Sequence, residues 1–188
     1  MLEDENKKAK KDSSTDVIVI GVGSIGYRHL RYAANRYANV VAIDTDEAKL
    51  QLIHKEYGAS VSAFSSLEDF FLRDGSSYSS ATAVVSNLGP DHFSTVKALL
   101  EKGIQKILLE KPVSNSISTC QDLVALQRLS GASIVVGFRR RHSGIVEAVR
   151  RSANEHCGSP PTTVVVHGGG SGHVNERHSL ARFCLRAI

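Results

Sequence analysis

The sequence has no tryptophan, and aromatic residues make up only 6% of its 188 positions. Stacking platforms for single-stranded nucleic acid depend on aromatic side chains, so this scarcity argues against that function. The net charge of +4 is modest and includes two basic clusters, Lys7–Lys11 and Arg139–Arg141. The first is typical of a solvated tail; the alternative, a nucleic-acid patch, lacks the interleaved aromatic residues that would support it. We therefore expect no nucleic-acid partner.

Cysteines and long apolar runs are also scarce. Three cysteines at wide, irregular spacing indicate neither a disulfide framework nor a zinc site: Cys120, Cys157 and Cys184. His173 and His178 raise the alternative of a metal pair, but a full ligand set is missing, so a flexible loop is favoured and no metal is predicted. No apolar run approaches the roughly 20 residues that span a bilayer. The charged N-terminus has no apolar stretch typical of a secretory signal, which predicts a cytoplasmic protein without a membrane partner.

Short apolar runs alternate with helical periodicity along most of the chain. Val17–Ile20 is a continuous β-branched run, typical of a strand covered on both faces of a parallel sheet. Tyr27–Ala38 has apolar residues at three- and four-residue spacing, which predicts a helix before the next strand, Val40–Ile43. Four more strands are expected at Val61–Phe64, Ala81–Ser86, Ile107–Leu109 and Ser133–Val136, separated by helices at Asp46–Tyr57, Leu67–Leu72, Asp91–Lys102 and Ser116–Leu129. This order predicts an α/β fold with a doubly wound parallel sheet.

A glycine-rich turn joins the first strand to the first helix and fits the pattern G-x-G-x-x-G. Gly21 permits the tight turn, Gly23 lets the backbone approach a pyrophosphate, and Gly26 lets the helix pack on the strand. Ser24 and Ile25, between these glycines, are predicted to bind the cofactor, and the N-terminus of the helix that follows presents free N–H groups and a partial positive charge to the phosphates. The turn follows a buried-type strand, so it predicts a Rossmann dinucleotide site. The competing interpretation is an S-adenosylmethionine-dependent methyltransferase.

Asp44 ends the second strand and bears on which cofactor is bound. It lies 23 residues after Gly21, close to the roughly 20 expected for a ribose-binding carboxylate. A carboxylate there accepts hydrogen bonds from the ribose hydroxyls but repels a 2′-phosphate. Thr45 and Asp46 follow, with no Arg to hold a phosphate, and Asp46 is interpreted as a helix cap. The pattern favours NAD over NADP.

The regular alternation ends at Gly137. Beyond it we expect a further helix at Ile145–Ala153, a strand at Thr162–His167 and a glycine-rich break. The expected organisation is a disordered tail at 1–15, a dinucleotide-binding domain at 16–137 and the start of a second, incomplete α/β domain at 138–188.

Three later segments resemble the glucose–fructose oxidoreductase/inositol dehydrogenase (Gfo/Idh/MocA) family. They read AVVSNLGPDHFSTVKALLEK from Ala83, ILLEKPVS from Ile107 and IVVGFRRR from Ile134. In that family a His begins a helix that ends at Gly, a strand then ends in Glu-Lys-Pro, and a later strand ends in Gly-Phe with an Arg nearby. The matching residues are His92, Gly103, Glu110, Lys111, Pro112, Gly137, Phe138 and Arg141, and the resemblance covers about Val17 to Val166.

The resemblance implies roles for individual residues. Lys111 would stand beside the nicotinamide and polarise or orient a substrate hydroxyl or carbonyl as the catalytic residue, while Glu110 would hold Lys111 or the nicotinamide ribose. Asn87 and Leu88 stand where the family usually has Thr-Pro beside the nicotinamide. His92 either approaches the cofactor or has a structural role at its helix start, and Arg141 would pair with a substrate oxygen or with Glu110.

The resemblance also implies an activity, an NAD(P)-dependent hydride transfer to or from a hydroxyl-bearing carbon of a sugar, inositol or sugar derivative. Family members are longer, and their second domain supplies much of the substrate wall and the usual acid/base His, for which we find no counterpart after Asp122. We therefore expect this chain to be truncated, weak or inactive as an enzyme, and prone to form homo-oligomers. The alternative is a non-catalytic nucleotide-binding remnant or interaction module.

Overall fold

A computed structural model gives the fold of the chain and describes residues 11–73, 80–138 and 143–157. The chain divides into two units, Met1–Phe138 and Arg139–Ile188. This division falls one residue after the boundary expected from the sequence. The first unit holds the sheet, and the described part of the second is one helix, α6 (Gly144–Cys157).

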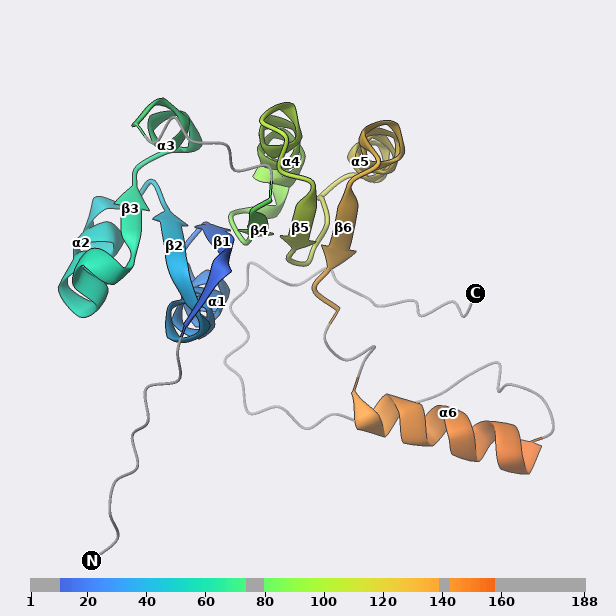
Figure 1. Ribbon diagram of the computed structural model, residues 1–188. Coiled ribbons are helices and arrows are strands. Elements are labelled where there is room, and N and C mark those ends of the chain that lie inside the picture. The colour runs from blue at the N-terminus through green and yellow to red at the C-terminus, as the bar shows by residue number, and fades with distance from the viewer. Residues whose placement is uncertain (1–10, 74–79, 139–142, 158–188) are drawn as a thin grey trace, which may run out of the picture. The chain divides into compact units, whose positions relative to one another are not determined.

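Six parallel strands form the sheet of the first unit. Figure 1 shows them side by side in the order β3-β2-β1-β4-β5-β6. Every neighbouring pair is parallel. The strands are β1 (Asp12–Ile20), β2 (Tyr37–Ile43), β3 (Ser62–Phe64), β4 (Thr82–Val85), β5 (Lys106–Leu109) and β6 (Ser133–Val136). The predicted doubly wound parallel sheet is confirmed.

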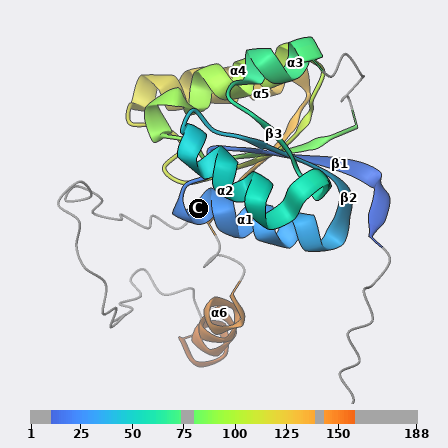
Figure 2. The same cartoon turned by 90° about the vertical axis from the view of Figure 1, so that its left-hand side faces the viewer.

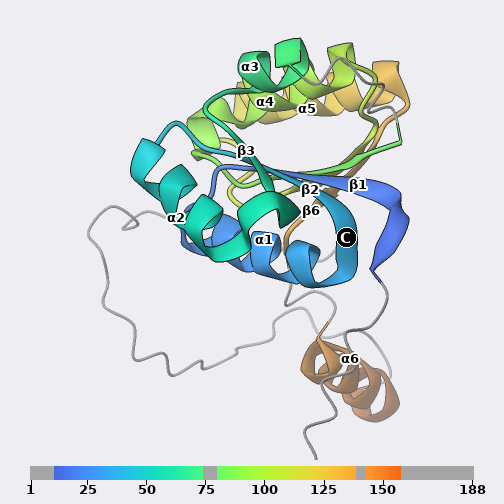
Figure 3. The same ribbon diagram turned by 60° about the vertical axis from the view of Figure 1, so that its left-hand side comes forward.

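Helices cover both faces of this sheet. One layer contains α1 (Ser24–Arg36) and α2 (Glu47–Tyr57), and the opposite layer contains α3 (Leu67–Arg73), α4 (His92–Glu101) and α5 (Ile117–Ser130) (Figures 2 and 3). Two short 3₁₀ turns, η1 (Gly58–Ser60) and η2 (Gly89–Asp91), complete the described connections. Parallel strands need such crossovers, which is why helices lie on both faces.

Strand β1 shows why the apolar run in the sequence is unbroken. Ile18 and Ile20 pack in the core beneath α3, α4 and α5, while Val17 and Val19 pack in the core beneath α1 and α2. All four side chains are buried. Successive residues of a strand point to opposite faces, so a central strand with two covered faces has no position for a polar side chain.

Side chains cap the starts of α2 and α5, and the cap of α2 was expected from the sequence. Asp46 accepts a hydrogen bond from the Ala48 N–H at 3.0 Å and caps α2. Ser116 accepts one from the Thr119 N–H at 3.2 Å and caps α5. Both contacts satisfy amide groups that have no acceptor inside the helix.

Three boundaries in the first unit differ from the sequence expectations by more than one residue. Strand β1 begins at Asp12, so the expected tail at 1–15 is wrong for Asp12–Thr15, because Asp12 pairs with Tyr37 of β2. For the same reason Tyr37 and Ala38 belong to β2 and not to the preceding helix. Strand pairing here prevails over helical periodicity, since paired backbone groups outweigh local propensity. Helix α1 begins at Ser24, ahead of the expected Tyr27, because Gly23 takes the N-cap position.

Helix α6 begins one residue before the expected Ile145 and extends past the expected end at Ala153. The expected strand at Thr162–His167, together with His173 and His178, lies outside the described residues. Within the described ranges, no helix is both long and apolar enough to cross a membrane.

The order in which successive strands are added to the sheet reverses between β1 and β4. From β1 it proceeds to β2 and β3 on one side, and β4, β5 and β6 continue on the other. In open α/β sheets this switch point, at the carboxyl ends of the strands, is where ligands bind. A ligand site is therefore expected at the loops after β1, β2, β4 and β5.

Candidate functional site

The glycine turn after β1 is held tightly against the sheet. Gly21 has a φ of +81°, and a Cβ there would lie 2.4 Å from the Asn87 amide nitrogen. A Cβ on Gly26 would lie 1.8 Å from the Gly21 carbonyl oxygen and 2.6 Å from Ser86 Oγ. Both positions exclude any side chain, so these two glycines are explained by the turn and by the close packing of α1 on the strands.

Gly23 has a different environment. Its φ of −75° and ψ of −166° suit any residue, and a Cβ there would meet no atom within 4 Å. The fold itself therefore gives no reason for glycine at this position. Gly23 is the N-cap of α1, and no side chain accepts a hydrogen bond from the N–H groups at the helix start. This cradle fits a dinucleotide pyrophosphate.

Asp44, at the end of β2, lies against the glycine turn. Its Oδ2 accepts the Val22 N–H at 2.6 Å and its Oδ1 accepts the Asp46 N–H at 2.9 Å. The Lys49 ammonium, from α2, lies 3.2 Å from both carboxylate oxygens. Sequence reasoning selected Asp44 but missed Lys49, whose only signal was its place one helical turn after the Asp46 cap.

A groove between α1 and α2 opens beside these residues, with a volume of about 730 Å³. Gly23 and Ser24 belong to its lining, and Arg28, Arg31 and Lys49 make it basic. The Arg31 guanidinium also lies over the Tyr32 ring, 5.7 Å from its centroid. The groove thus extends the phosphate-binding turn with positive charge, a feature that the sequence pattern did not indicate.

Tyrosines from both helices meet near this groove. The Tyr27 hydroxyl donates a hydrogen bond to the Glu56 carboxylate, which raises the pKa of Tyr27. The pKa of Tyr57 is also raised, chiefly because burial disfavours its charged form. Tyr27 lines the groove, so this pairing joins α1 to α2 on the side where a nucleotide would lie.

The loop after β4 faces the glycine turn at the switch point. Ser86 Oγ lies within donor distance of the carbonyl oxygens of Ile20, at 3.0 Å, and Gly21, at 2.8 Å. Asn87 donates from Nδ2 to Thr95 Oγ1 at 2.8 Å, and its buried Oδ1 has no partner among the described residues. Leu88 is 73% exposed. Of the two predicted cofactor contacts of this loop, Asn87 stands beside the glycine turn, and Leu88 is the exposed residue that follows it.

His92 begins α4 and is only 1% exposed. Its Nδ1 lies 3.3 Å from the Val113 carbonyl oxygen and its Nε2 lies 3.2 Å from that of Asn87. The ring therefore connects the loop after β4 to the loop after β5. This geometry favours the structural role that the sequence left open, and a contact of His92 with the cofactor stays a prediction.

The Glu-Lys-Pro segment follows β5 at the same edge. The Glu110 side chain is buried; its Oε1 lies 2.9 Å from His29 Nε2 and its Oε2 accepts the Lys111 N–H at 3.3 Å. A Cβ on Gly137 would lie 3.0 Å from the Glu110 carboxylate, so the glycine after β6 makes room for it. Lys111 is exposed, and its ammonium has no hydrogen-bond or ion-pair partner in the described part of the chain. Sequence reasoning missed His29, which lies one helical turn after Gly26.

Residues 15–138 match the sequence profile of the GFO_IDH_MocA oxidoreductase family, described as having an NAD-binding Rossmann fold. The chain belongs to the Gfo/Idh/MocA family. The match spans every residue of the site described above, and the resemblance expected from the sequence is confirmed.

Solved structures of several dehydrogenases share the fold. Myo-inositol 2-dehydrogenase from Lactobacillus plantarum superposes with a TM-score of 0.63 at 18% identity, covering 78% of this chain and 42% of that chain. The WlbA dehydrogenase from Bordetella pertussis, in complex with NADH and UDP-GlcNAcA, gives 0.63 at 20% identity, covering 78% and 43%. Scyllo-inositol dehydrogenase from Lactobacillus casei, with NAD(H) and scyllo-inositol, gives 0.62 at 18% identity, covering 77% and 42%.

The chain spans less than half the length of these solved structures. No curated protein matches its sequence. At these identities the superpositions establish the shared Rossmann fold, and they leave substrate and activity to be argued from the residues of this Gfo/Idh/MocA chain.

The structure brings most of the predicted site residues to one edge of the sheet. The glycine turn, Asp44, the loop after β4 and the Glu-Lys-Pro segment meet there. Arg141 lies outside the described residues, as do Arg139 and Arg140. Within the described ranges, no group of three or more His, Cys, Asp or Glu side chains is placed to hold a metal ion.

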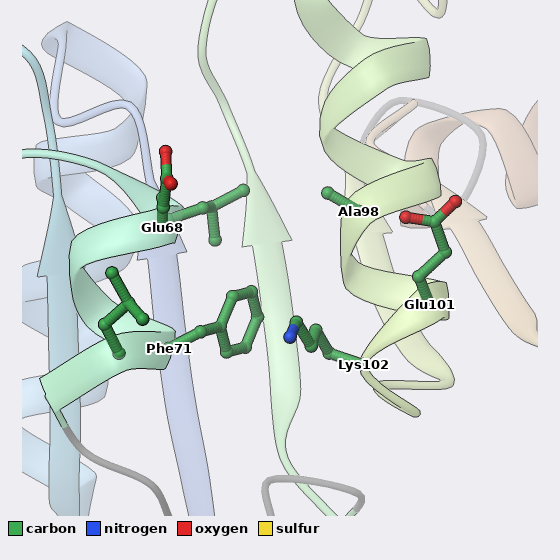
Figure 4. A pocket seen from close by; sticks show the side chains of 7 residues that line it. Glu68, Phe71, Ala98, Glu101 and Lys102 are labelled. Atoms are coloured by element: carbon green, nitrogen blue, oxygen red, sulfur yellow. The ribbon is translucent and has the colours of Figure 1, made fainter.

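A second groove of about 430 Å³ lies between α3 and α4. Its lining includes Phe71, and Figure 4 shows the Lys102 ammonium directed at the Phe71 ring, 5.4 Å from the centroid. None of the residues of the switch-point site contributes to it. The switch point therefore remains the candidate active site of this Gfo/Idh/MocA chain.

Proposed function

We propose that the chain is the cofactor-binding part of an NAD(P)-dependent oxidoreductase that transfers hydride between the nicotinamide and a hydroxyl-bearing carbon of a sugar, inositol or sugar derivative. One observation carries the proposal. Asp44, after β2, is bonded to the glycine turn after β1, and Lys111, exposed and unpaired within the described residues, follows β5, two strands from β1 at the same edge of the sheet. A ribose-binding carboxylate and a free cation thus flank the switch point.

The residues of the glycine turn bind the cofactor in this proposal. The N–H groups at the start of α1, which no side chain caps, and the cradle at Gly23 receive the pyrophosphate beside Ser24 and Ile25, and Gly21 and Gly26 fix the turn around it. Asp44 accepts hydrogen bonds from the adenosine ribose, which favours NADH over NADPH. When bound, the nicotinamide supplies the hydride chemistry.

Lys111 is the proposed catalytic residue. Its exposed ammonium can donate to a substrate oxygen, holding a hydroxyl in place or polarising a carbonyl. Glu110 is a positioning residue, because its buried carboxylate contacts both the Lys111 amide and His29. Contacts of Asn87, Leu88, His92 and Arg141 with the cofactor or substrate are proposed from the family resemblance.

The substrate class is proposed from the structural relatives. The Lactobacillus casei structure contains scyllo-inositol and the Bordetella pertussis structure contains UDP-GlcNAcA. Both ligands carry ring hydroxyl groups, the functional group on which a Lys111 ammonium and a hydride acceptor would act together. A small polyol or sugar derivative is therefore the partner to test.

The test is a titration of the purified chain with NADH, NADPH and S-adenosylmethionine, followed by turnover assays with inositols and sugars. The proposal expects saturable NADH binding and no binding of S-adenosylmethionine. Binding of S-adenosylmethionine alone would instead assign the glycine turn to a methyltransferase, and failure of every nucleotide to bind would remove the cofactor site.

A nucleotide-binding module without catalysis is the second candidate. The burial of His92 favours it, because both ring nitrogens face backbone carbonyl groups and neither is directed at a substrate beside Lys111. Cofactor binding without turnover, in the presence of inositols and sugars, supports this second function.

A further inference from the structure

The Asp44 carboxylate already has partners on both of its oxygens. Two backbone N–H groups, from Val22 and Asp46, occupy one position on each oxygen, and the Lys49 ammonium lies 3.2 Å from both oxygens. Lys49 lies 3.6 Å from Asp46 Oδ2 as well. The Asp44 side chain is 8% exposed and that of Lys49 is 40% exposed. Lys49 therefore covers the solvent side of the carboxylate with an opposite charge.

This arrangement changes what a nucleotide meets at Asp44. A bare carboxylate repels a ribose 2′-phosphate, and that repulsion is the usual basis for excluding NADPH. Here the ammonium offsets the negative charge at close range and itself carries donors suited to phosphate. Arg28 and Arg31 line the same groove and add to its positive potential.

We propose that Lys49 is a specificity-determining residue that narrows the preference for NADH over NADPH. The chain then also binds NADPH, less tightly than NADH, with the 2′-phosphate beside the Lys49 ammonium. The proposal rests on the proposed cofactor function. Its physical basis is the pairing of one carboxylate, which favours ribose hydroxyls, with one ammonium, which favours the phosphate.

The experiment measures the affinities of the full chain for NADH and NADPH by titration in Lys49→Met, Lys49→Gln and Lys49→Arg variants. Lys55→Met is the matched control, because Lys55 is an exposed lysine further along the same helix without a hydrogen bond or ion pair to Asp44 among the described residues. Thermal melts verify that each variant is folded. ADP-ribose and its 2′-phosphate are titrated in parallel to place any effect at the adenosine end.

We expect Lys49→Met and Lys49→Gln to weaken NADPH binding about tenfold, the effect of losing one charge-assisted hydrogen bond. NADH affinity should stay within about threefold, since Asp44 regains its outer positions for ribose hydroxyls. Lys49→Arg should keep NADPH binding, and Lys55→Met should resemble the wild type. If Asp44→Ala alone raises NADPH affinity above that of the wild type, adding Lys49→Met to that variant should abolish the increase.

An unchanged ratio of the two affinities in both neutral variants overturns the proposal, as does an equal loss for both cofactors, which would make Lys49 structural. In those outcomes wild-type NADH binding still stands, so the proposed function survives. Failure of the wild-type chain to bind either nucleotide overturns the proposed function and this inference together.

Discussion

His29 Nε2 lies 2.9 Å from Glu110 Oε1, joining helix α1 to the end of strand β5. A carboxylate can only accept hydrogen bonds, so the imidazole nitrogen donates. The glycine turn begins α1 and Lys111 follows Glu110, so this one contact connects the proposed phosphate cradle to the loop of the proposed catalytic residue. Glu110 is buried, and a buried carboxylate without its donor is costly.

Replacing His29 with Leu should therefore destabilise the chain by about 1–3 kcal/mol, the cost of leaving a buried acceptor unpaired. His29→Gln, which keeps a side-chain donor, should lose less. Urea unfolding monitored by circular dichroism measures both variants. Equal stability of wild type and His29→Leu would show that the contact does not hold Glu110.

Gly23→Val should abolish NADH binding and leave the fold intact. The backbone at Gly23 suits any residue and a Cβ meets no protein atom, so the added side chain fills only the pyrophosphate cradle. Gly26→Ala is the contrasting variant, because its Cβ would overlap the Gly21 carbonyl oxygen. It should lower stability by more than about 2 kcal/mol. NADH titration and thermal melts distinguish the two, and unchanged affinity in folded Gly23→Val would remove the turn from the site.

Asp44→Ala should lower NADH affinity about tenfold or more, by removing charge-assisted hydrogen bonds to ribose, and should narrow the preference over NADPH. Asp122→Ala, at an exposed carboxylate on α5, controls for the loss of one negative charge. The ratio of the two affinities is the measurement. If the wild-type chain binds NADPH as tightly as NADH, the assigned role of Asp44 is wrong.

The isolated chain should bind NADH yet oxidise inositols and sugars poorly, because correct positioning of substrate supplies up to roughly 7–11 kcal/mol of rate enhancement and the described residues complete only the cofactor-binding sheet. Lys111→Ala should leave NADH affinity within about threefold and reduce any turnover about a hundredfold. Lys106→Ala, at the opposite end of β5, is the control. Robust turnover that Lys111→Ala abolishes would show that the chain suffices for catalysis.

Tyr57 should cause the free energy of unfolding to fall as the pH rises into the alkaline range. Burial raises its pKa, so the folded state holds the proton more tightly than the unfolded state does. The resulting stability is present below pH of about 10, the unfolded value, and is lost as the pH rises through the folded value. Tyr57→Phe should flatten this loss, because phenylalanine has no hydroxyl to titrate. Urea unfolding against pH measures this, with Tyr32→Phe at an exposed position as control.

The sequence by itself determined the fold class and the position of the glycine turn that we propose binds the cofactor. The unbroken β-branched run Val17–Ile20 predicts a strand buried on both faces, because such a strand has no position for a polar side chain. The glycines that follow predict a tight turn, because Gly21 and Gly26 leave no room for a Cβ. The spacing of Asp44 and the Glu-Lys-Pro segment could also be read directly, since both are local to strand ends.

Only the tertiary structure decided which side chains meet. His29 and Glu110 are 81 residues apart in sequence, and only the parallel order of the sheet brings α1 beside the end of β5. The burial of His92 between two loops and the covering of Asp44 by Lys49 likewise depend on packing between elements. Local periodicity encodes which face of an element is apolar, whereas pairing across elements depends on register and distance, which no single segment of the sequence contains.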